Sequence, residues 1–595
     1  MGRAMTYSPP LRDLAFSLEY VAGANALRPL FPGYDADTEA AVLEAAGRLA
    51  RDVLAPLNRV GDTEGARFEN GRVFAAPGFR EAYKAFAEGG WNALSADPDF
   101  GGQGLPKALE IATFEMFNAA NMAFGLCPIL TQGALEALAA HGSPSQKSRY
   151  LPKLVSGEWT GTMNLTEPQS GSDLASLRTR AEPNADGTYR LTGQKIFITW
   201  GDHDCAENIV HLVLARLPGA PPGTKGVSLF VASKRLVNDD GSLGAANALK
   251  AGGIEHKLGI HGSPTCTMLY EGAHAELVGE ENRGLAHMFT MMNAARLQIG
   301  TQGVAISERA YQQALAYALE RRQGRSVWTG DYPARLFDLP DVRRTLMLMK
   351  AQIEAARGIC LSTAVATDLS RHAPDEAARA AAKLREKLLT PIAKGWSTDV
   401  GVEVASQGVQ VHGGMGFIEE TGAAQHYRDA RIAPIYEGTN GIQAIDLVGR
   451  KLTLADGEAV RSLIADISET AQALAQSSDA RLQSIGERLA TAANAVRETT
   501  AWLTARHATA DSLAGASAYL RLLGDTTGGW MLAKGALAAA RNLAQGDDSY
   551  WSTKIALAHL YSECVLTRTQ GLSGSVMLGA DALSETTAEG LGAVS

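Results

Sequence analysis

One carboxylate in this chain, that of Glu437, has neighbours that would suit a general base. Glu437 follows the apolar residues 432–436 and is followed at once by Gly438, Thr439 and Asn440. Apolar neighbours disfavour the charged form of a carboxylate, so we expect the pKa of Glu437 to rise toward the range useful for proton abstraction. Gly438 would let a ligand approach the backbone closely. The alternative is a surface glutamate just before a helix, with Thr439 or Asn440 as the N-cap.

A second stretch, residues 163–173, combines a flexible loop with hydroxyl groups. Its sequence is MNLTEPQSGSD, in which Gly171 and Ser172 offer accessible N–H groups and Thr166 offers a hydroxyl. These groups could surround a polar ligand. A plain turn in which Asp173 caps a helix is the more ordinary interpretation, and the stretch taken alone favours it.

A third stretch, residues 195–199, has the alternation of a strand. Phe197 and Thr199 alternate with Ile196 and Ile198. Because successive side chains of a strand point to opposite faces, we expect Phe197 and Thr199 to share one face. An aromatic ring beside a hydroxyl suits a ligand surface, whereas the segment taken alone favours a core phenylalanine.

The elements that position these groups belong to a long chain of ordinary composition. Its 595 residues are too many for a single core, and three or four units are expected. Apolar residues make up 46% of the chain and charged residues 20%, as in ordinary globular proteins. The net charge is -9 with no strongly basic block, so nucleic acid is not expected as a partner.

Cysteine usage and the N-terminal sequence indicate the compartment. The five cysteines are far apart, odd in number and without a C-x-x-C pair, which fits a reducing cytosol better than a disulfide framework or a zinc ribbon. No apolar signal-peptide core opens the chain, and no run of about 18 apolar residues follows. In residues 457–508 arginines alternate with acidic residues, which favours a packing unit over a membrane-bound one. We therefore expect a cytoplasmic protein with no membrane partner and no metal.

Hydrophobic periodicity predicts an α+β chain that is mainly α. Helices are expected over 40–54, 77–88, 108–121, 133–141 and 145–156, then over 284–322, 339–367, 374–408 and 438–454, and finally over 457–475, 479–508 and 510–544. Strands are expected over 189–199, 208–216, 225–232 and 268–276. The corresponding parts are an extension (1–36), an all-helical domain (37–160), a small β domain (161–283), a four-helix bundle (284–450) and an extra helical domain (451–595), whose tail after about 571 is expected to be loose.

Two glycine-rich loops suggest a dinucleotide fold, and both fail its pattern. After Gly102 and Gly104 the final glycine of G-x-G-x-x-G is replaced by Lys107, and after residues 414–416 it is replaced by Glu419. No alternating strand precedes the first loop. A nicotinamide-binding Rossmann fold is therefore not expected.

Five motifs occur in a fixed order along residues 90–450. They are 163–173 (MNLTEPQSGSD), 195–199 (KIFIT), 255–260 (EHKLGI), 410–417 (QVHGGMGF) and 427–442 (YRDARIAPIYEGTNGI). The motifs, and the order of helical unit, β domain and bundle, resemble the acyl-CoA dehydrogenase family. The extension and the extra C-terminal helical domain resemble its long bacterial branch.

This resemblance implies FAD as the cofactor and Glu437 as the catalytic base. It implies that FAD is held by Met163, Leu165, Thr166, Ser172, Phe197, Thr199, Arg321, Gln410, Gly413, Gly414 and Thr439, and that the substrate is held by Ser172, Asn293, Arg296 and Gly438. A flavin needs a covered ring face, a polarised N5 and hydrogen-bonded phosphates, and the aromatic ring and hydroxyl of the 195–199 strand suit the first two needs.

The sequence departs from the family pattern at several places. Arg321 lacks the Phe-Gly pair that usually follows it, because no Phe precedes Gly324, and Gly441 stands where many members have Gln. Some members carry the base on the helix that here contains Ala295. Alanine accepts no proton, so the resemblance leaves Glu437 as the base.

The implied reaction is α,β-dehydrogenation of an acyl-CoA thioester, with the α-proton taken by Glu437. Residues 7–13 and 54–61 resemble the branch that acts on 3-methylthiopropanoyl-CoA in dimethylsulfoniopropionate degradation. The alternatives are a general short-, medium- or long-chain fatty acyl-CoA dehydrogenase and, less favoured, an acyl-CoA oxidase or a non-catalytic acyl-CoA-binding protein. Residues 122–132 are expected to line the acyl pocket. Electron-transfer flavoprotein is the implied acceptor, and a homodimer, or else a tetramer, the implied assembly.

Overall fold

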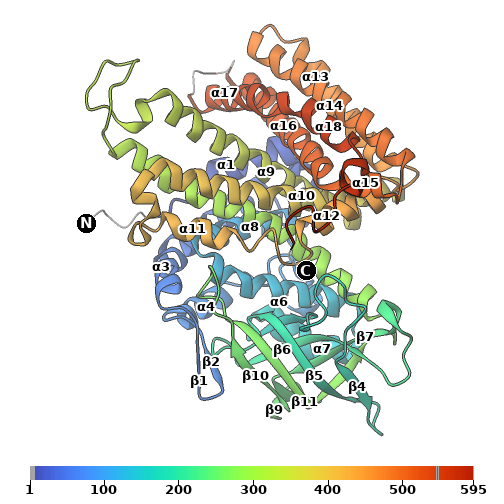
Figure 1. Cartoon of the computed structure of the whole chain (residues 1–595). Helices are drawn as coiled ribbons and strands as arrows, with labels where there is room; N and C mark the ends of the chain where they lie inside the picture. The colour runs from blue at the N-terminus through green and yellow to red at the C-terminus, as the bar shows by residue number, and fades with distance from the viewer. Residues whose placement is uncertain (1–6, 544–545, 547–548, 594–595) are drawn as a thin grey trace. The chain divides into compact units, whose positions relative to one another are not determined.

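The computed structural model describes residues 7–543, 546 and 549–593, which form two compact units. The first comprises residues 7–9 and Phe31–Gln298, and the second comprises Pro10–Leu30 and the chain from Ile299 onward. Figure 1 shows helices in both units and a β-sheet in the first.

The first unit begins with helices and one short hairpin. Its elements are α2 (Ala36–Leu49), a π-helical turn (Ala50–Leu54), α3 (Ala55–Thr63), β1 (Arg67–Glu69), β2 (Arg72–Phe74), α4 (Phe79–Glu88), α5 (Lys107–Ala120), α6 (Met122–His141) and α7 (Pro144–Ser156). The expectation of an all-helical region over 37–160 is therefore wrong at the β1–β2 hairpin. These strands are only three residues long, too short for a period-two pattern to be recognised.

The β domain of the first unit is a small closed barrel with two added strands. Its strands are β3 (Trp159–Asn164), β4 (Arg180–Pro183), β5 (Tyr189–Thr199), β6 (Asn208–Arg216), β7 (Val227–Ser233), β8 (Arg235–Val237), β9 (Leu243–Ala246), β10 (Leu249–Ile254) and β11 (Thr265–Val278). Strands β5, β4, β6, β7 and β11 pair in a circle, β10 extends it beside β11, and β3 extends it beside β6 in parallel. Closure removes the exposed strand edges of this circle.

Alternating side chains of β6 enter two separate cores. Val213 and Ala215 belong to the barrel interior, with Phe230 among their neighbours. Leu212 and Leu214 belong to a second cluster, which also contains residues of α6 and α7. All four side chains are buried. A strand buried on both faces reads as a continuous apolar run, and the barrel wall is thereby packed against the helical part of its own unit.

Helix α6 combines the length of a membrane span with the burial of a core helix. Of the helices that the structure describes, it alone is long and apolar enough to cross a membrane. However, 89% of its most apolar 18-residue stretch is buried inside the protein. The expected acyl-pocket residues 122–132 lie on it and are buried. The sequence predicted a helix only from residue 133, because Gly125 and Pro128 interrupt the helical pattern.

The second unit consists mainly of helices, several of them long. They are α1 (Leu11–Phe16) with a π-helical turn (Ser17–Ala22), most of α8 (Gly284–Glu320), α9 (Pro340–His372), α10 (Glu376–His412), α11 (Ala423–Ala430), α12 (Asn440–Asp446), α13 (Glu458–Ala475), α14 (Ala480–Ala505), α15 (Ala510–Ala514), α16 (Ala516–Leu543), α17 (Ser549–Cys564), α18 (Thr569–Met577) and α19 (Asp581–Ser584). Helices α9 and α10 pack along each other, and α16 packs on α9, α10 and α12. The last expected bundle helix, 438–454, is shorter than predicted, and the tail expected to be loose contains α18 and α19.

A half-buried carboxylate fixes the N-terminal extension within the second unit. Asp13 of α1 lies 2.7 Å from Lys350 Nζ and 2.8 Å from Lys554 Nζ, and it accepts a hydrogen bond of 2.9 Å from Tyr550 Oη. Burial raises the pKa of Asp13, but the two ammonium groups outweigh that effect and hold the pKa well below its usual range. The extension is thus bound by charge as well as by apolar contact.

Candidate functional site

Glu437 lies in the turn between α11 and α12, on a backbone that glutamate rarely adopts. Its φ is +55° and that of Gly438 is +80°, both in the left-handed region. The Glu437 side chain is half-buried. A non-glycine residue held there costs on the order of 1 kcal/mol and persists only where its surroundings fix it. The turn therefore holds a carboxylate in a defined conformation; the expected rise of its pKa stays a prediction.

Tyr436, the residue before this carboxylate, is anchored to α8. Its hydroxyl donates a hydrogen bond to Gln302 Oε1 of α8. Burial raises the pKa of the Tyr436 phenol, and the negative charge of Glu437 raises it further. The phenol therefore stays protonated and keeps donating at any physiological pH.

The residues after Glu437 are held by hydrogen bonds within their own loop and from α12. Gln443 Nε2 donates to the carbonyl of Gly438 at 3.1 Å, and the N–H of Asn440 donates to the carbonyl of Pro434 at 2.9 Å. Thr439 occupies the N-cap position of α12, but its hydroxyl donates to the Pro434 carbonyl instead of capping the helix. The loop is thus closed on itself around Glu437.

In the first unit, the two predicted flavin segments adjoin each other. The N–H of Ile196 donates to the carbonyl of Thr166 at 2.9 Å. Lys195 lies beside this bond, and its Nζ donates to the Leu165 carbonyl at 3.0 Å. The loop after β3 and the end of β5 therefore form one continuous surface.

A buried ion pair underlies this surface. Lys195 Nζ lies 2.8 Å from Glu167 Oε1, with side-chain exposures of 0% and 3%. Glu167 also accepts hydrogen bonds from the N–H of Arg178 at 2.7 Å and from the N–H and hydroxyl of Thr179 at 3.0 and 2.6 Å. A buried carboxylate with this many donors ties the loop to β5 and to the segment just before β4.

The pKa values of the pair follow from this environment. Burial raises the pKa of Glu167, but the charge of Lys195 and the donated hydrogen bonds outweigh it and lower the pKa to about 2. Burial lowers the pKa of Lys195 to about 8, against the opposing pull of Glu167. Both side chains are charged at neutral pH.

A β-bulge presents Phe197 to solvent. The register of β5 against β11 shifts between Lys195 and Ile198, and Phe197 has a φ of +59°. Its ring is 58% exposed whereas Ile198 is buried, so the interpretation of Phe197 as a core residue is wrong. Thr199 is half-buried two residues further on. Bulges re-aim side chains next to functional sites, and this one exposes an aromatic ring beside a hydroxyl.

The remaining predicted residues of the first unit differ in exposure. Met163 is buried in the core that includes α6, and Ser172 is exposed in the loop after β3. Arg296 is buried on α8, and its Nη1 donates to Asn293 Oδ1 at 3.1 Å. Asp173 accepts a hydrogen bond from the N–H of Ala175 in a turn and caps no helix.

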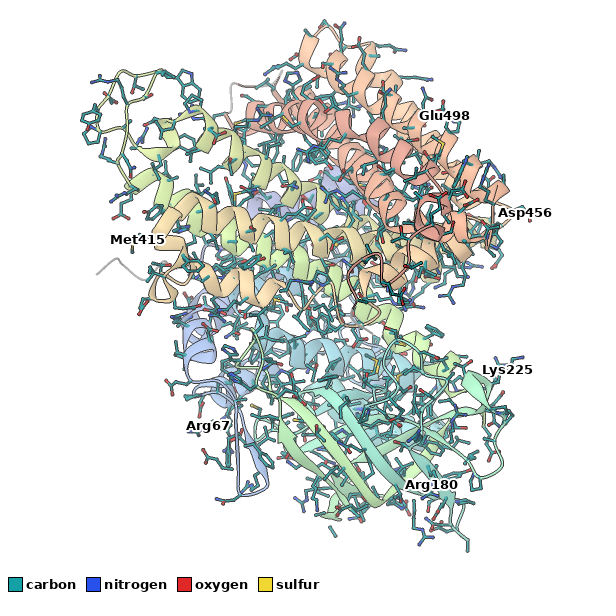
Figure 2. The ribbon with its side chains drawn as sticks, viewed as in Figure 1. Arg67, Arg180, Lys225, Met415, Asp456 and Glu498 are labelled. Atoms are coloured by element: carbon teal, nitrogen blue, oxygen red, sulfur yellow. The ribbon has the colours of Figure 1, made fainter. Side chains whose placement is uncertain are left out.

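The predicted residues of the second unit, apart from those in the Glu437 loop, lie at the ends of α8 and α10. Gln410, Gly413 and Gly414 are exposed where α10 ends, and a Cβ added at either glycine would meet open space. Met415, which follows them, is labelled in Figure 2. Arg321 follows α8, is exposed and lies 3.5 Å from Gln323 Oε1. The open glycine turn could admit a bulky group at the backbone.

The buried pair Glu167–Lys195 was not predicted from the sequence. Both residues lie inside the recognised motifs, but nothing in the motifs indicated that they would pair. A lysine in a strand that otherwise alternates is the signal that could have found it, because a lysine on an inward position needs a buried partner. Asn440 was considered only as an N-cap, although its side chain binds α10 as described below.

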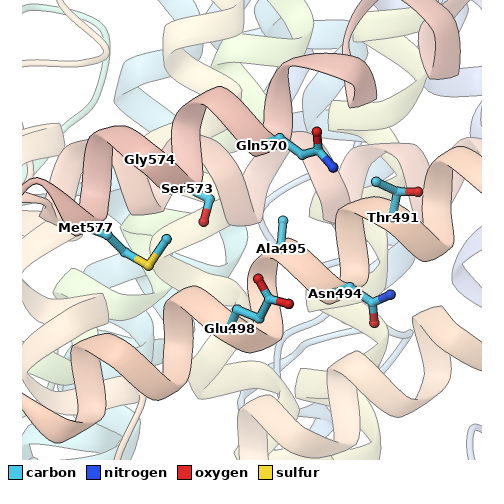
Figure 3. Close-up of a pocket in the computed structure, with 8 residues that line it drawn as sticks. All are labelled: Thr491, Asn494, Ala495, Glu498, Gln570, Ser573, Gly574 and Met577. Atoms are coloured by element: carbon cyan, nitrogen blue, oxygen red, sulfur yellow. The ribbon is translucent and has the colours of Figure 1, made fainter.

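A hollow in the second unit, between α14 and α18, is lined by none of the predicted site residues (Figure 3). Its volume is about 480 Å³, and it is lined by Thr491, Asn494, Ala495, Glu498, Gln570, Ser573, Gly574 and Met577. This lining offers hydroxyls, amides and one carboxylate but no cation or aromatic ring. Such a lining does not suit a flavin or a phosphate-bearing thioester. Among the residues that the structure describes, no cluster of three metal-ligating side chains was found either.

Four family models match successive parts of the chain. They are the N-terminal domain of acyl-CoA dehydrogenase (residues 36–158), its middle domain (162–273), its C-terminal domain (282–452) and an acetyl-CoA dehydrogenase C-terminal-like domain (463–587). Together they cover well over half of the chain.

Individual proteins match along nearly the full length. The chain is 48% identical to a 3-methylmercaptopropionyl-CoA dehydrogenase of Ruegeria pomeroyi, over 94% of this chain and 96% of that one. It is 33% identical to the broad-specificity linear acyl-CoA dehydrogenase FadE5 of Mycobacterium tuberculosis, over 94% and 95%. Its fold matches the crystal structure of an acyl-CoA dehydrogenase complexed with FAD from Bacillus anthracis, with a TM-score of 0.74, 21% identity and coverage of 94% and 90%.

Proposed function

Because this chain belongs to the acyl-CoA dehydrogenase family, we propose that it is an FAD-dependent dehydrogenase of 3-methylthiopropanoyl-CoA that forms the 2,3-enoyl thioester. The observation that carries the catalytic assignment is the closed loop that holds Glu437 at a φ of +55°. The Ruegeria relative, at 48% identity over almost the whole chain, supports the substrate. The same proposal places the enzyme in dimethylsulfoniopropionate degradation.

In this proposal Glu437 removes the α-proton of the thioester. Its backbone N–H donates to the thioester oxygen, where negative charge develops. Gly438, Ser172, Asn293 and Arg296 hold the substrate. The rigid loop keeps the carboxylate in one orientation, so little reorganisation is needed when the proton moves.

The residues proposed to hold FAD suit a flavin. In the first unit, Leu165 and Thr166 offer backbone groups near the exposed Phe197 ring, and Thr199 and Ser172 offer hydroxyls, whereas Met163 lies in the core that includes α6. FAD, when bound, supplies the acceptor for the hydride that leaves the β-carbon. In the second unit the proposed contacts are Arg321, Gln410, Gly413, Gly414 and Thr439, which offer a guanidinium, an amide, open backbone and a hydroxyl. The FAD complex of the Bacillus relative is consistent with the same cofactor.

Three parts of the proposal concern partners and location. Electron-transfer flavoprotein is the proposed electron acceptor, the assembly is a homodimer, and the compartment is the cytoplasm. The five cysteines are far apart, odd in number and without a C-x-x-C pair, which supports the cytoplasm. A broad-specificity dehydrogenase of linear acyl-CoA thioesters is the second candidate, and the Mycobacterium relative favours it.

An anaerobic titration tests substrate and cofactor together. The purified protein is mixed with 3-methylthiopropanoyl-, butanoyl-, octanoyl- and palmitoyl-CoA while the oxidised flavin band is followed. Fastest bleaching with the methylthio thioester is the expected result, whereas equal rates along the series would favour the second candidate. No flavin band, or no bleaching with any thioester, would refute the proposal.

Glu437→Gln tests the base. The amide cannot accept a proton, so flavin reduction by substrate should fall by about 10²- to 10⁴-fold while FAD content is unchanged. Glu420→Gln, at an exposed position of the same unit, is the matched control and should reduce at the normal rate. Near-normal reduction in Glu437→Gln would exclude Glu437 as the base.

A further inference from the structure

The extra C-terminal domain reaches the Glu437 loop through one turn of α10. We propose that α16 is a positioning element for the catalytic carboxylate: Asp525 of α16 holds Trp396 of α10, and the same turn of α10 holds Asn440 beside Glu437. This inference rests on the proposed role of Glu437 as the base. It assigns Asp525 and Trp396 as positioning residues, which act on the reaction through Asn440.

The first step is the set of hydrogen bonds by which α10 holds Asn440 of the Glu437 loop. Asn440, three residues after Glu437, donates from Nδ2 to the Gly395 carbonyl at 2.9 Å and to Asp399 Oδ1 at 2.7 Å. Its Oδ1 accepts a hydrogen bond of 2.9 Å from Lys394 Nζ. Both ends of the amide are therefore occupied by residues 394–399, and the position of α12's first residue follows the position of that turn.

The second step is the support of that turn by α16. Trp396 is 1% exposed, and its Nε1 donates to Asp525 Oδ1 at 2.8 Å. The indole lies directly on the α16 backbone, because a Cβ added at Gly524 would fall 2.2 Å from Trp396 Cδ1. A Cβ added at Gly395 would fall 2.7 Å from Leu520 Cδ2. The α10 turn is thus packed tightly on α16 through two glycines.

The third step is the fixation of Asp525 itself. Its carboxylate lies 2.9 Å from Arg521 Nε, and Arg521 also forms an ion pair with Glu403 of α10. The Tyr561 hydroxyl of α17 donates to the Asp525 carbonyl at 3.0 Å. The carboxylate that accepts the Trp396 hydrogen bond is therefore held by the charge of Arg521, and the backbone of Asp525 is held by α17.

A test replaces Trp396 by Phe, which keeps an aromatic ring but removes the Nε1–H. We expect the rate of flavin reduction by substrate to fall roughly ten-fold with KM unchanged, because small misplacements of a reacting group can cost up to about 10²-fold. Trp530→Phe is the matched control. Trp530 is also buried, on α16, and its Nε1 donates to Thr470 Oγ1 at 2.8 Å, on α13 rather than α10. Both variants should lose similar thermal stability, and only Trp396→Phe should slow reduction.

A second pair of variants and a second readout keep the test independent of folding and of the cofactor. Asp525→Asn retains an oxygen acceptor for Trp396 and should keep most of the rate, whereas Asp525→Leu should lose it. Hydrogen exchange at the backbone N–H of Asn440, measured without substrate, should accelerate in Trp396→Phe and Asp525→Leu but not in Trp530→Phe.

The outcomes separate this inference from the proposed function. Full activity in Glu437→Gln would overturn the proposed function and the inference with it. An inactive Glu437→Gln together with equal reduction rates and equal exchange in Trp396→Phe and Trp530→Phe would overturn the inference alone. Slower reduction and faster exchange confined to Trp396→Phe and Asp525→Leu would support it.

Discussion

The buried pair Lys195–Glu167 gives the sharpest prediction for the first unit. Lys195→Met removes the ammonium group and leaves Glu167 buried with its hydrogen bonds from Arg178 and Thr179. Breaking a buried pair by removing one partner costs about 3–5 kcal/mol. The direction agrees with the pKa of Glu167, which the charge and hydrogen bond of Lys195, together with the hydrogen bonds from Thr179 and Arg178, lower to about 2. We therefore expect a loss of about 3 kcal/mol.

The loss depends on pH with a defined sign. The pKa of Glu167 is lower in the folded than in the unfolded state, so its stabilisation is fully present above pH 4.5 and is lost as the pH falls toward 2. By pH 4 about 0.8 kcal/mol of it should be gone. The difference between wild type and Lys195→Met should accordingly be largest near pH 7 and shrink below pH 4.5.

Native-state hydrogen exchange measures this loss locally, which suits a chain with several cooperative units. The reporter is the amide of Ile196, which donates to the Thr166 carbonyl. Lys107→Met is the control, because Lys107 forms a similarly buried pair with Glu110 at 2.7 Å on α5. It should destabilise the unit without selective opening at Ile196.

The double variant Lys195→Met/Glu167→Gln completes a thermodynamic cycle. It should recover part of the loss, because no unpaired charge remains buried. A loss below about 1 kcal/mol in the single variant, or one that does not change between pH 7 and pH 4, would show that the pair is not coupled as argued.

Two further substitutions test other parts of the fold. Gly193→Ala should lower the free energy of unfolding by about 1–3 kcal/mol, because Gly193 has a φ of +155° and a new Cβ would fall 2.9 Å from Thr179 Cα. Gly187→Ala is the control, because Gly187 has a positive φ but open space around a new Cβ, and it should lower stability less in thermal unfolding. Equal losses in the two variants would contradict this. Asp13→Asn removes the charge facing two lysines, so residues 10–30 should become sensitive to limited proteolysis, whereas exposed Glu19→Gln should not change cleavage. Unchanged protection in Asp13→Asn would refute the role of this ion pair.

Much of the architecture was readable because it depends on local patterns. The strands 189–199 and 208–216 were predicted with the bounds of β5 and β6, since β-branched runs between turn residues are a local signal. Long helices such as α9 and α10 were found by their periodicity. The β1–β2 hairpin, α6 upstream of residue 133 and the helices α17, α18 and α19 were missed. Short strands and glycine- or proline-containing helices are stabilised by packing rather than by propensity.

The sequence by itself determined the family, the order of the parts and the identity of Glu437 as the candidate base, because motif residues and their spacing are written along the chain. Tertiary structure alone decided how these residues are held. Lys195 pairs with Glu167 across 28 positions, Asn440 binds Asp399 across 41, and Trp396 binds Asp525 across 129. Such contacts depend on which helix and strand faces meet after folding, and no local pattern of side chains specifies that meeting.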